Sequence, residues 1–298
     1  MSEERRAVTP IRPAAAYIGG KRRLGELLAR RIEAVPHETY AEPFVGMGGV
    51  FFRRRWAPRR EVINDISRDV ATLFRILQRH YPQFMETLKF QITSRAEFER
   101  LAASNADTLT DLERAGRFLY LQRLAFGGKV AGRNFGIETA GSSRFDVTKL
   151  GPILEEIHSR LAGVAIECLS WREFIDRYDT AGTLFYLDPP YWGSEDDYGA
   201  GVFTRAEFVG LAARLGRIAG QFILSVNDVP ETREIFRRFA IETVATRYTV
   251  SGGKSGRDRR HRAVGGAAAR LAGICCRSRK ARDWRGKGRG RSSPARMG

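Results

Sequence analysis

Apolar and polar positions alternate along most of the chain in a way that predicts strands and helices in turn. Short apolar runs predict buried strands, and apolar residues three or four positions apart predict amphipathic helices. One short strand is expected from residue 40, with others over 61–66, 164–169, 183–187, 221–226 and 241–250, and helices over 24–32, 67–78, 147–161, 204–219 and 231–239. Such alternation is typical of an α/β fold with a mostly parallel sheet, here ended by a terminal strand or hairpin.

The alternation stops between residues 81 and 147. Residues 82–103 are polar with a helical pattern, and residues 109–126 predict a strong amphipathic helix. A long loop rich in glycine, cations and amides follows, and such a loop inside a compact domain is usually functional or disordered. The pattern predicts an α/β domain of residues 1–74 and 161–253, a mainly helical insert at 75–160, and a basic, disordered tail at 254–298.

Candidate chemistry lies where the apolar run Thr183–Leu187 meets Asp188-Pro189-Pro190-Tyr191. Proline lacks an N–H and fixes φ, so the strand must end there, at the edge where open α/β sheets bind ligands. An exocyclic ring amine is a poor nucleophile, but the carboxylate of Asp188 and the carbonyl of Pro189 could hold its two hydrogens while Tyr191 stacks on the ring. The motif favours amine methylation, although a Pro-Pro turn closing a buried strand has the same sequence.

Two glycine-containing segments predict a nucleoside site. Tyr17-Ile-Gly-Gly-Lys21 precedes the first helix, and glycines 46, 48 and 49 form a turn that lets a ligand approach bare backbone. Asp65 ends the second strand, where an acid can accept hydrogen bonds from ribose hydroxyls. S-adenosylmethionine fits these groups, and the candidate ligands are Tyr17, Lys21, Gly46, Gly48, Asp65 and Asp188. A ligand-free glycine turn, a solvated lysine and a helix N-cap at Asp65 remain as simpler explanations.

Composition narrows the function further. Of the formal net charge of +17, residues 254–298 supply +13, with 15 basic and 2 acidic residues. A basic chain suggests a polyanion partner, and the loop after residue 126 carries groups that contact phosphates and base edges, namely Lys129, Arg133, Asn134 and Arg144. A solvated hairpin explains that loop equally well.

We expect no signal peptide, membrane span, disulfide framework or zinc site, and hence a cytoplasmic protein.

In combination, these motifs resemble the Dam-type (D12 class) DNA adenine-N6 methyltransferases over about residues 14–253. The matching segments are Tyr17-Ile-Gly-Gly-Lys21, Glu42-Pro-Phe-Val-Gly-Met-Gly48, Asn64-Asp65, Leu121-Gln-Arg123 with Phe126-Gly-Gly-Lys129, and Asp188-Pro-Pro-Tyr191. The resemblance implies a Rossmann-like methyltransferase fold with a terminal antiparallel hairpin and a helical target-recognition insert. It also implies methyl transfer from S-adenosylmethionine to the N6 amine of a flipped-out adenine in double-stranded DNA, without a metal.

The resemblance also implies roles for individual residues. Those for the reaction are Asp188, Pro189, Pro190 and Tyr191; those for the cofactor are Tyr17, Lys21, Glu42, Phe44, Gly46, Gly48, Asp65 and Asp188; and those for DNA are Arg123, Lys129, Arg133, Asn134 and Arg144. A monomer is expected, and a cognate restriction endonuclease is a possible partner.

One departure from the family concerns the C-terminus. Arg262-Ala-Val-Gly265 begins the family's last apolar strand, and the following glycine, alanine and arginine residues diverge. This predicts an edge strand that is missing or substituted near residues 266–270, with reduced stability. Two other functions stay open: an amine methyltransferase acting on RNA or on a glutamine side chain, and a DNA-binding protein that has lost turnover because of the altered end.

Overall fold

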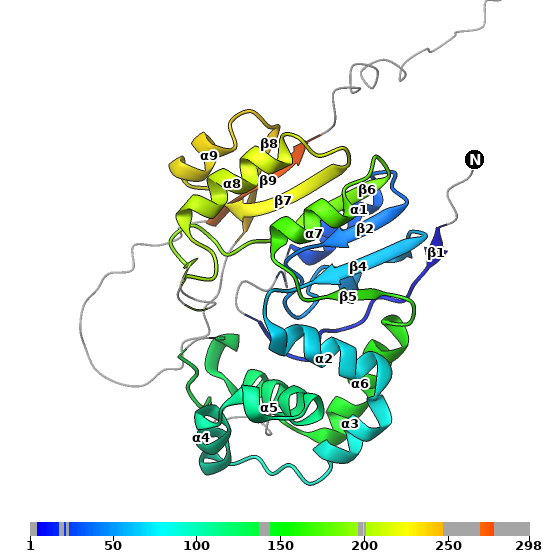
Figure 1. Ribbon diagram of the computed structural model, residues 1–298, viewed down its shortest axis with the longest axis vertical. Helices are drawn as coiled ribbons and strands as arrows, with labels where there is room; N and C mark the ends of the chain where they lie inside the picture. Colours follow the sequence, from blue (N-terminus) through cyan, green and yellow to red (C-terminus); the bar gives the residue numbers. More distant parts are fainter. Residues whose placement is uncertain are drawn as a thin grey trace, which may run out of the picture.

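The computed structural model describes residues 5–17, 21, 24–130, 132–136, 144–195, 199, 201–246 and 269–276. Its centre is a seven-stranded sheet in the order β5-β4-β2-β6-β7-β9-β8 (Figure 1). The strands are β2 (Thr39–Glu42), β4 (Arg60–Asn64), β5 (Ala165–Glu167), β6 (Thr183–Leu187), β7 (Gln221–Asn227), β8 (Ile241–Thr246) and β9 (Ala269–Cys276). A separate two-stranded ribbon joins β1 (Arg6–Ala7) to β3 (Trp56–Ala57).

The five strands from β5 to β7 are parallel, and their order places a topological switch beside β2. The chain runs outward from β2 through β4 to β5, and then returns to β6 on the other side of β2. Ligands of open α/β sheets bind at the carboxyl ends of the strands that flank such a switch. Glu42 ends β2 and Asp188 follows β6, so two acids lie at this position.

Both faces of the sheet are covered, which explains the apolar runs of its central strands. Tyr40 and Tyr186 face a core that includes helices α1 (Gly25–Glu33) and α2 (Arg68–Arg79). Their neighbours Ala41 and Phe185 face a second core on the other side, because successive side chains of a strand point in opposite directions. Helices α7 (Trp171–Tyr178), α8 (Arg205–Leu215) and α9 (Pro230–Ile235) cover that second face.

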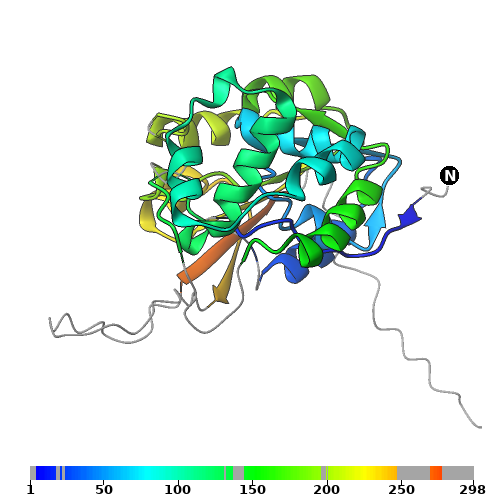
Figure 2. The same cartoon turned by 90° about the horizontal axis from the view of Figure 1, so that it is seen from below.

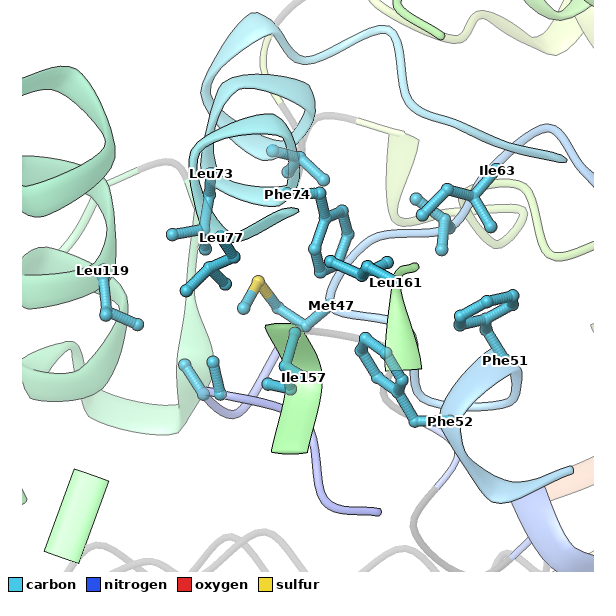
Figure 3. Packing of buried hydrophobic residues seen from close by; sticks show 14 of the residues in the cluster. Met47, Phe51, Phe52, Ile63, Leu73, Phe74, Leu77, Leu119, Ile157 and Leu161 are labelled. Carbon is cyan, nitrogen blue, oxygen red and sulfur yellow. The ribbon is translucent and has the colours of Figure 1, made fainter. Parts of the chain in front are cut away.

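The insert packs directly on α2, which continues unbroken across the expected boundary at residues 74 and 75. Its helices lie together below the sheet in Figure 1. In Figure 3, Leu119 lies opposite Leu73 and Leu77 of α2, within one continuous apolar cluster. The helices of this region are α3 (Tyr81–Leu88), α4 (Arg95–Ala103), α5 (Asp111–Leu124) and α6 (Val147–Arg160). The described residues also form the short 3-10 turns η1 (Phe51–Arg53), η2 (Ala106–Thr108) and η3 (Phe126–Gly128).

The α/β fold expected from the sequence is confirmed, but the prediction for the C-terminus is wrong in part. Residues 269–276, expected to be disordered, form β9, which lies between β7 and β8 and is antiparallel to both (Figure 2, orange beside gold). Ladder hydrogen bonds are made by the backbone, so a strand of atypical sequence can still pair with two neighbours. The expected strand over 241–250 ends at Thr246, and residues 247–268 and 277–298 lie outside the described part.

No helix among the described residues is long and apolar enough to cross a membrane.

Candidate active site

Asp188 lies at the carboxyl end of β6 and is held by groups from two other parts of the chain. The Lys21 ammonium is 2.6 Å from Asp188 Oδ1, and the Ser225 hydroxyl donates to the same oxygen at 2.7 Å. Ser225 lies on β7, and its hydroxyl also contacts the hydroxyl of Tyr186 at 3.1 Å. The carboxylate therefore has a fixed position at the sheet edge, as the sequence predicted.

Burial dominates the electrostatics of this acid. It raises the pKa of Asp188 above its ordinary value, while the charge of Lys21 and hydrogen bonds from Lys21 and Ser225 partly oppose the increase. Lys21 is itself buried, and its ammonium lies 4.6 Å from the centre of the Tyr191 ring. The ion pair leaves Asp188 acceptor capacity, because a carboxylate oxygen has more than one lone pair.

The glycine turn after β2 is joined to Asp65 by its backbone. Gly46 has a φ of +50°, and its N–H donates to Asp65 Oδ2 at 2.9 Å. A Cβ at position 46 would lie 2.9 Å from the Tyr17 ring, so only glycine fits there. Burial raises the pKa of Asp65 to about 6, although the N–H groups of Ser67 and Gly46 favour the charged form. Asp65, which directly follows β4, therefore orders the glycine turn.

Glu42 forms the buried end of β2. The Tyr40 hydroxyl donates to Glu42 Oε2 at 2.6 Å. Burial raises the pKa of Glu42 to about 8, and the Tyr40 hydrogen bond and the charge of Arg54 oppose this increase. A carboxyl with so perturbed a pKa in a cavity wall is typical of a functional site.

A cavity of about 1110 Å³ opens at this edge of the sheet. Its wall contains most of the predicted cofactor and catalytic residues, namely Tyr17, Lys21, Glu42, Phe44, Gly46, Asp65, Asp188 and Pro190. Three predicted residues are not part of the wall as described: Gly48, Pro189 and Tyr191. Gly48, with a φ of +73°, lies against the Phe52 ring, which explains its lack of a side chain by packing.

One part of the cavity wall was missed by sequence reasoning. It includes Trp171 and Glu207, and the Trp171 Nε1–H donates to Glu207 Oε2 at 2.7 Å. Arg172 donates to the same carboxylate oxygen at 2.5 Å and lies 4.3 Å from the Trp171 ring. The signal was available, because Leu169, Ser170 and Trp171 follow β5 just as Asp188 follows β6, at the same edge of the sheet.

The five predicted DNA contacts are in different environments. Lys129 and Asn134 are exposed. Arg133 is turned toward α5, where it donates to Gln122 Oε1 at 3.4 Å and lies 5.6 Å from the Phe118 ring.

The other two predicted contacts lie close together. Arg123 donates to the backbone carbonyls of Arg144 at 2.8 Å and of Ala14 at 3.0 Å. It therefore joins the insert to the N-terminal segment beside the cavity, whose wall also contains Arg123.

Within the described ranges, no group of three or more histidine, cysteine, aspartate or glutamate side chains could hold a metal ion.

A parallel sheet ended by an antiparallel pair, with a glycine turn and an acid-Pro-Pro-aromatic motif at one edge, defines an α/β methyltransferase. The family model of the D12 class N6 adenine-specific DNA methyltransferases matches residues 17–250. The chain therefore belongs to this family, and the resemblance drawn from its motifs is confirmed.

Curated relatives agree with this assignment. The chain is 28% identical over 194 residues to the type II methyltransferase M1.LlaDCHI of Lactococcus lactis subsp. cremoris, covering 61% of this chain and 66% of that one. It is 22% identical over 230 residues to M.CviBI of Paramecium bursaria Chlorella virus NC1A, covering 76% and 86%. It is 23% identical over 208 residues to M.MjaIII of Methanocaldococcus jannaschii, covering 61% and 69%.

Proposed function

We propose that the chain transfers a methyl group from S-adenosylmethionine to the N6 amine of an adenine flipped out of double-stranded DNA. The observation that carries the proposal is the meeting of Asp188, Glu42 and the Gly46 turn in one cavity. At about 1110 Å³ the cavity exceeds a typical small-ligand pocket of roughly 300–1,000 Å³. That size suits a nucleoside cofactor and a base together.

The groups in the cavity wall fit the cofactor. S-adenosylmethionine carries ribose hydroxyls, a cationic sulfonium, an ammonium and a carboxylate. Asp65 would accept hydrogen bonds from the hydroxyls, Lys21 offers a positive charge for the amino-acid part, and Glu42 offers a negative charge above its raised pKa of about 8. When bound, the cofactor supplies an activated methyl group.

Asp188 acts on the target base. Its ionised carboxylate accepts one N6–H, and the carbonyl of Pro189 is proposed to accept the other, which turns the amine's lone pair toward the methyl donor. Lys21 and Ser225 keep Asp188 charged and fixed for this task. Flipping the base costs a few kcal/mol, and stacking on Tyr191 would offset part of that.

The DNA would lie over the cavity and the insert. We assign phosphate or base contacts to Lys129, Arg133, Asn134, Arg144 and Arg123. The exposed Lys129 and Asn134 can reach DNA directly. Arg123 is held by backbone carbonyls, so its contribution would include the placement of the N-terminal segment.

The proposal is tested by tritiated methyl transfer to adenine-containing duplexes. The wild-type chain should produce N6-methyladenine, and Asp188→Ala should lower the rate by about 10²- to 10³-fold, as expected when a preorganised acceptor is lost. Asp176→Ala is the control, because Asp176 lies on α7 and is exposed, with Arg214 as its partner. DNA binding without transfer by the wild type, or transfer to RNA alone, would contradict the proposal.

A further inference from the structure

Glu42 is the first of a series of buried groups in contact with one another that leads away from the cavity. Its carboxylate accepts from the Tyr40 hydroxyl, and both residues lie on β2. The Arg54 guanidinium lies 3.7 Å from the centre of the Tyr40 ring. Tyr40 and Arg54 are both 0% exposed, so the contact is made away from water, where a cation over an aromatic ring is worth most.

Arg54 is held in place from its far side. It forms a buried ion pair with Glu61 of β4, and Glu61 also accepts two hydrogen bonds from Arg160 at 2.8 and 2.7 Å. Arg54 Nε and Nη1 make no hydrogen bond among the described residues, and the faces of the Tyr40 and Phe51 rings are their neighbours. The two rings therefore form the surroundings of the Arg54 N–H groups that make no hydrogen bond.

The arrangement joins the cavity wall to the insert, because Arg160 is the last residue of α6. None of these groups except Glu42 reaches the cavity wall. A buried charge that touches no ligand is costly unless it is paired, and packing alone could be achieved by an apolar side chain at each position. Of these buried charges, Arg54 acts on the Glu42 carboxyl directly, and its charge favours the ionised form.

We propose that Tyr40 is a positioning residue for the cofactor site. Arg54 packs against the Tyr40 ring and fixes the Tyr40 hydroxyl, and this hydroxyl holds the Glu42 carboxylate toward the cavity and favours the charged form of Glu42. The proposal rests on the proposed function, because it takes S-adenosylmethionine as the ligand that Glu42 meets. Tyr40 touches no cofactor atom in this scheme and acts only through Glu42.

The sign of the effect follows from the groups that face Glu42. Tyr40 and Arg54 favour its charged form, as does Lys21, while Asp188 and burial favour the neutral form. A cationic cofactor binds the charged form better, so affinity should rise as the pH rises through the pKa of Glu42. Removing the Tyr40 hydroxyl removes one group that lowers this pKa, and the rise in affinity then shifts to higher pH.

The test is Tyr40→Phe in the full-length chain, with S-adenosylmethionine binding measured by titration calorimetry between pH 6 and 9. We expect affinity at pH 7.5 to fall about tenfold, the equivalent of one pKa unit, and to recover at higher pH. Tyr178→Phe is the matched control, because its hydroxyl donates to Glu167 at 2.5 Å outside the cavity wall. It should keep wild-type affinity.

A double-mutant cycle with Glu42→Gln separates positioning from general damage. If Tyr40 acts through Glu42, Tyr40→Phe should have no further effect on affinity in the Glu42→Gln background. Unchanged affinity of Tyr40→Phe at every pH, or an equal loss in both backgrounds, would overturn the inference while leaving the proposed function intact. Absence of cofactor binding by the wild type would overturn both.

Discussion

At the scale of single residues, Ser225 is, after Lys21, a group that adjusts the pKa of Asp188. Its hydrogen bond lowers the pKa of Asp188 against the effect of burial. Ser225→Ala should therefore raise that pKa further, because a hydrogen bond that favours the charged form is lost.

The consequence is a change in the pH dependence of methyl transfer. Because the charged carboxylate is the proposed acceptor, activity of Ser225→Ala should be lost at low pH and retained at high pH, with the acid limb of the kcat/KM profile shifted upward. Ser225→Thr keeps a hydroxyl and should keep the limb near its wild-type position. A uniform loss of activity at all pH values would instead mean that Ser225 only packs.

Sequence reasoning reached the residues whose position follows from where a strand ends. Asp65 and Asp188 each follow an apolar strand, so the parallel sheet brings them to one edge without further information. Ser225 and Tyr40 were out of reach, because their roles depend on hydrogen bonds across or along strands that apolar periodicity does not encode. Arg133 was placed in the DNA-contact set for its charge, but its side chain points to Gln122 and Phe118.

At the scale of elements, the pairing of β7 and β8 into the sheet depends on β9, a strand that the composition of the sequence did not predict. The strand pairs with six residues of β7 and with six of β8. Without it, β7 would expose an unpaired edge and β8 would lose its only partner within the described sheet. Residues 269–276 contain a short apolar run within a basic, glycine-rich segment, and composition alone does not identify it as a strand. The strand is recognised from its pairing with two other strands.

Proline within β9 tests this arrangement. Ala272 lies opposite Val226 on one side and Thr243 on the other. Ala272→Pro removes a ladder donor from an interior strand, and we expect the free energy of unfolding to fall by about 3 kcal/mol or more in urea denaturation. Ala281→Pro, beyond the end of the strand, is the control and should leave stability unchanged. Equal stability of both variants would remove β9 from the sheet.

At the scale of the whole molecule, positive charge is divided unequally. Residues 277–298 contain nine basic residues and one acid, after the last strand of the sheet. A chain that ends at Cys276 keeps every described element and loses a net charge of +8. Each phosphate contact contributes a slope of about −0.9 to the dependence of log affinity on log salt concentration. The number of basic side chains that contact phosphates can therefore be measured from this slope.

The truncated chain should therefore bind duplex DNA with a salt slope several units shallower than that of the full chain, while its melting temperature and the adenine that it methylates stay the same. Charge that contacts phosphates alone carries no sequence information, which is why affinity should change without specificity. Lys129→Ala in the full chain is the matched comparison, since one exposed cation on the insert loop should reduce the slope by about 1. If truncation leaves the slope unchanged, the charge of residues 277–298 does not meet the DNA, and the insert together with the cavity rim must supply all of the electrostatic attraction.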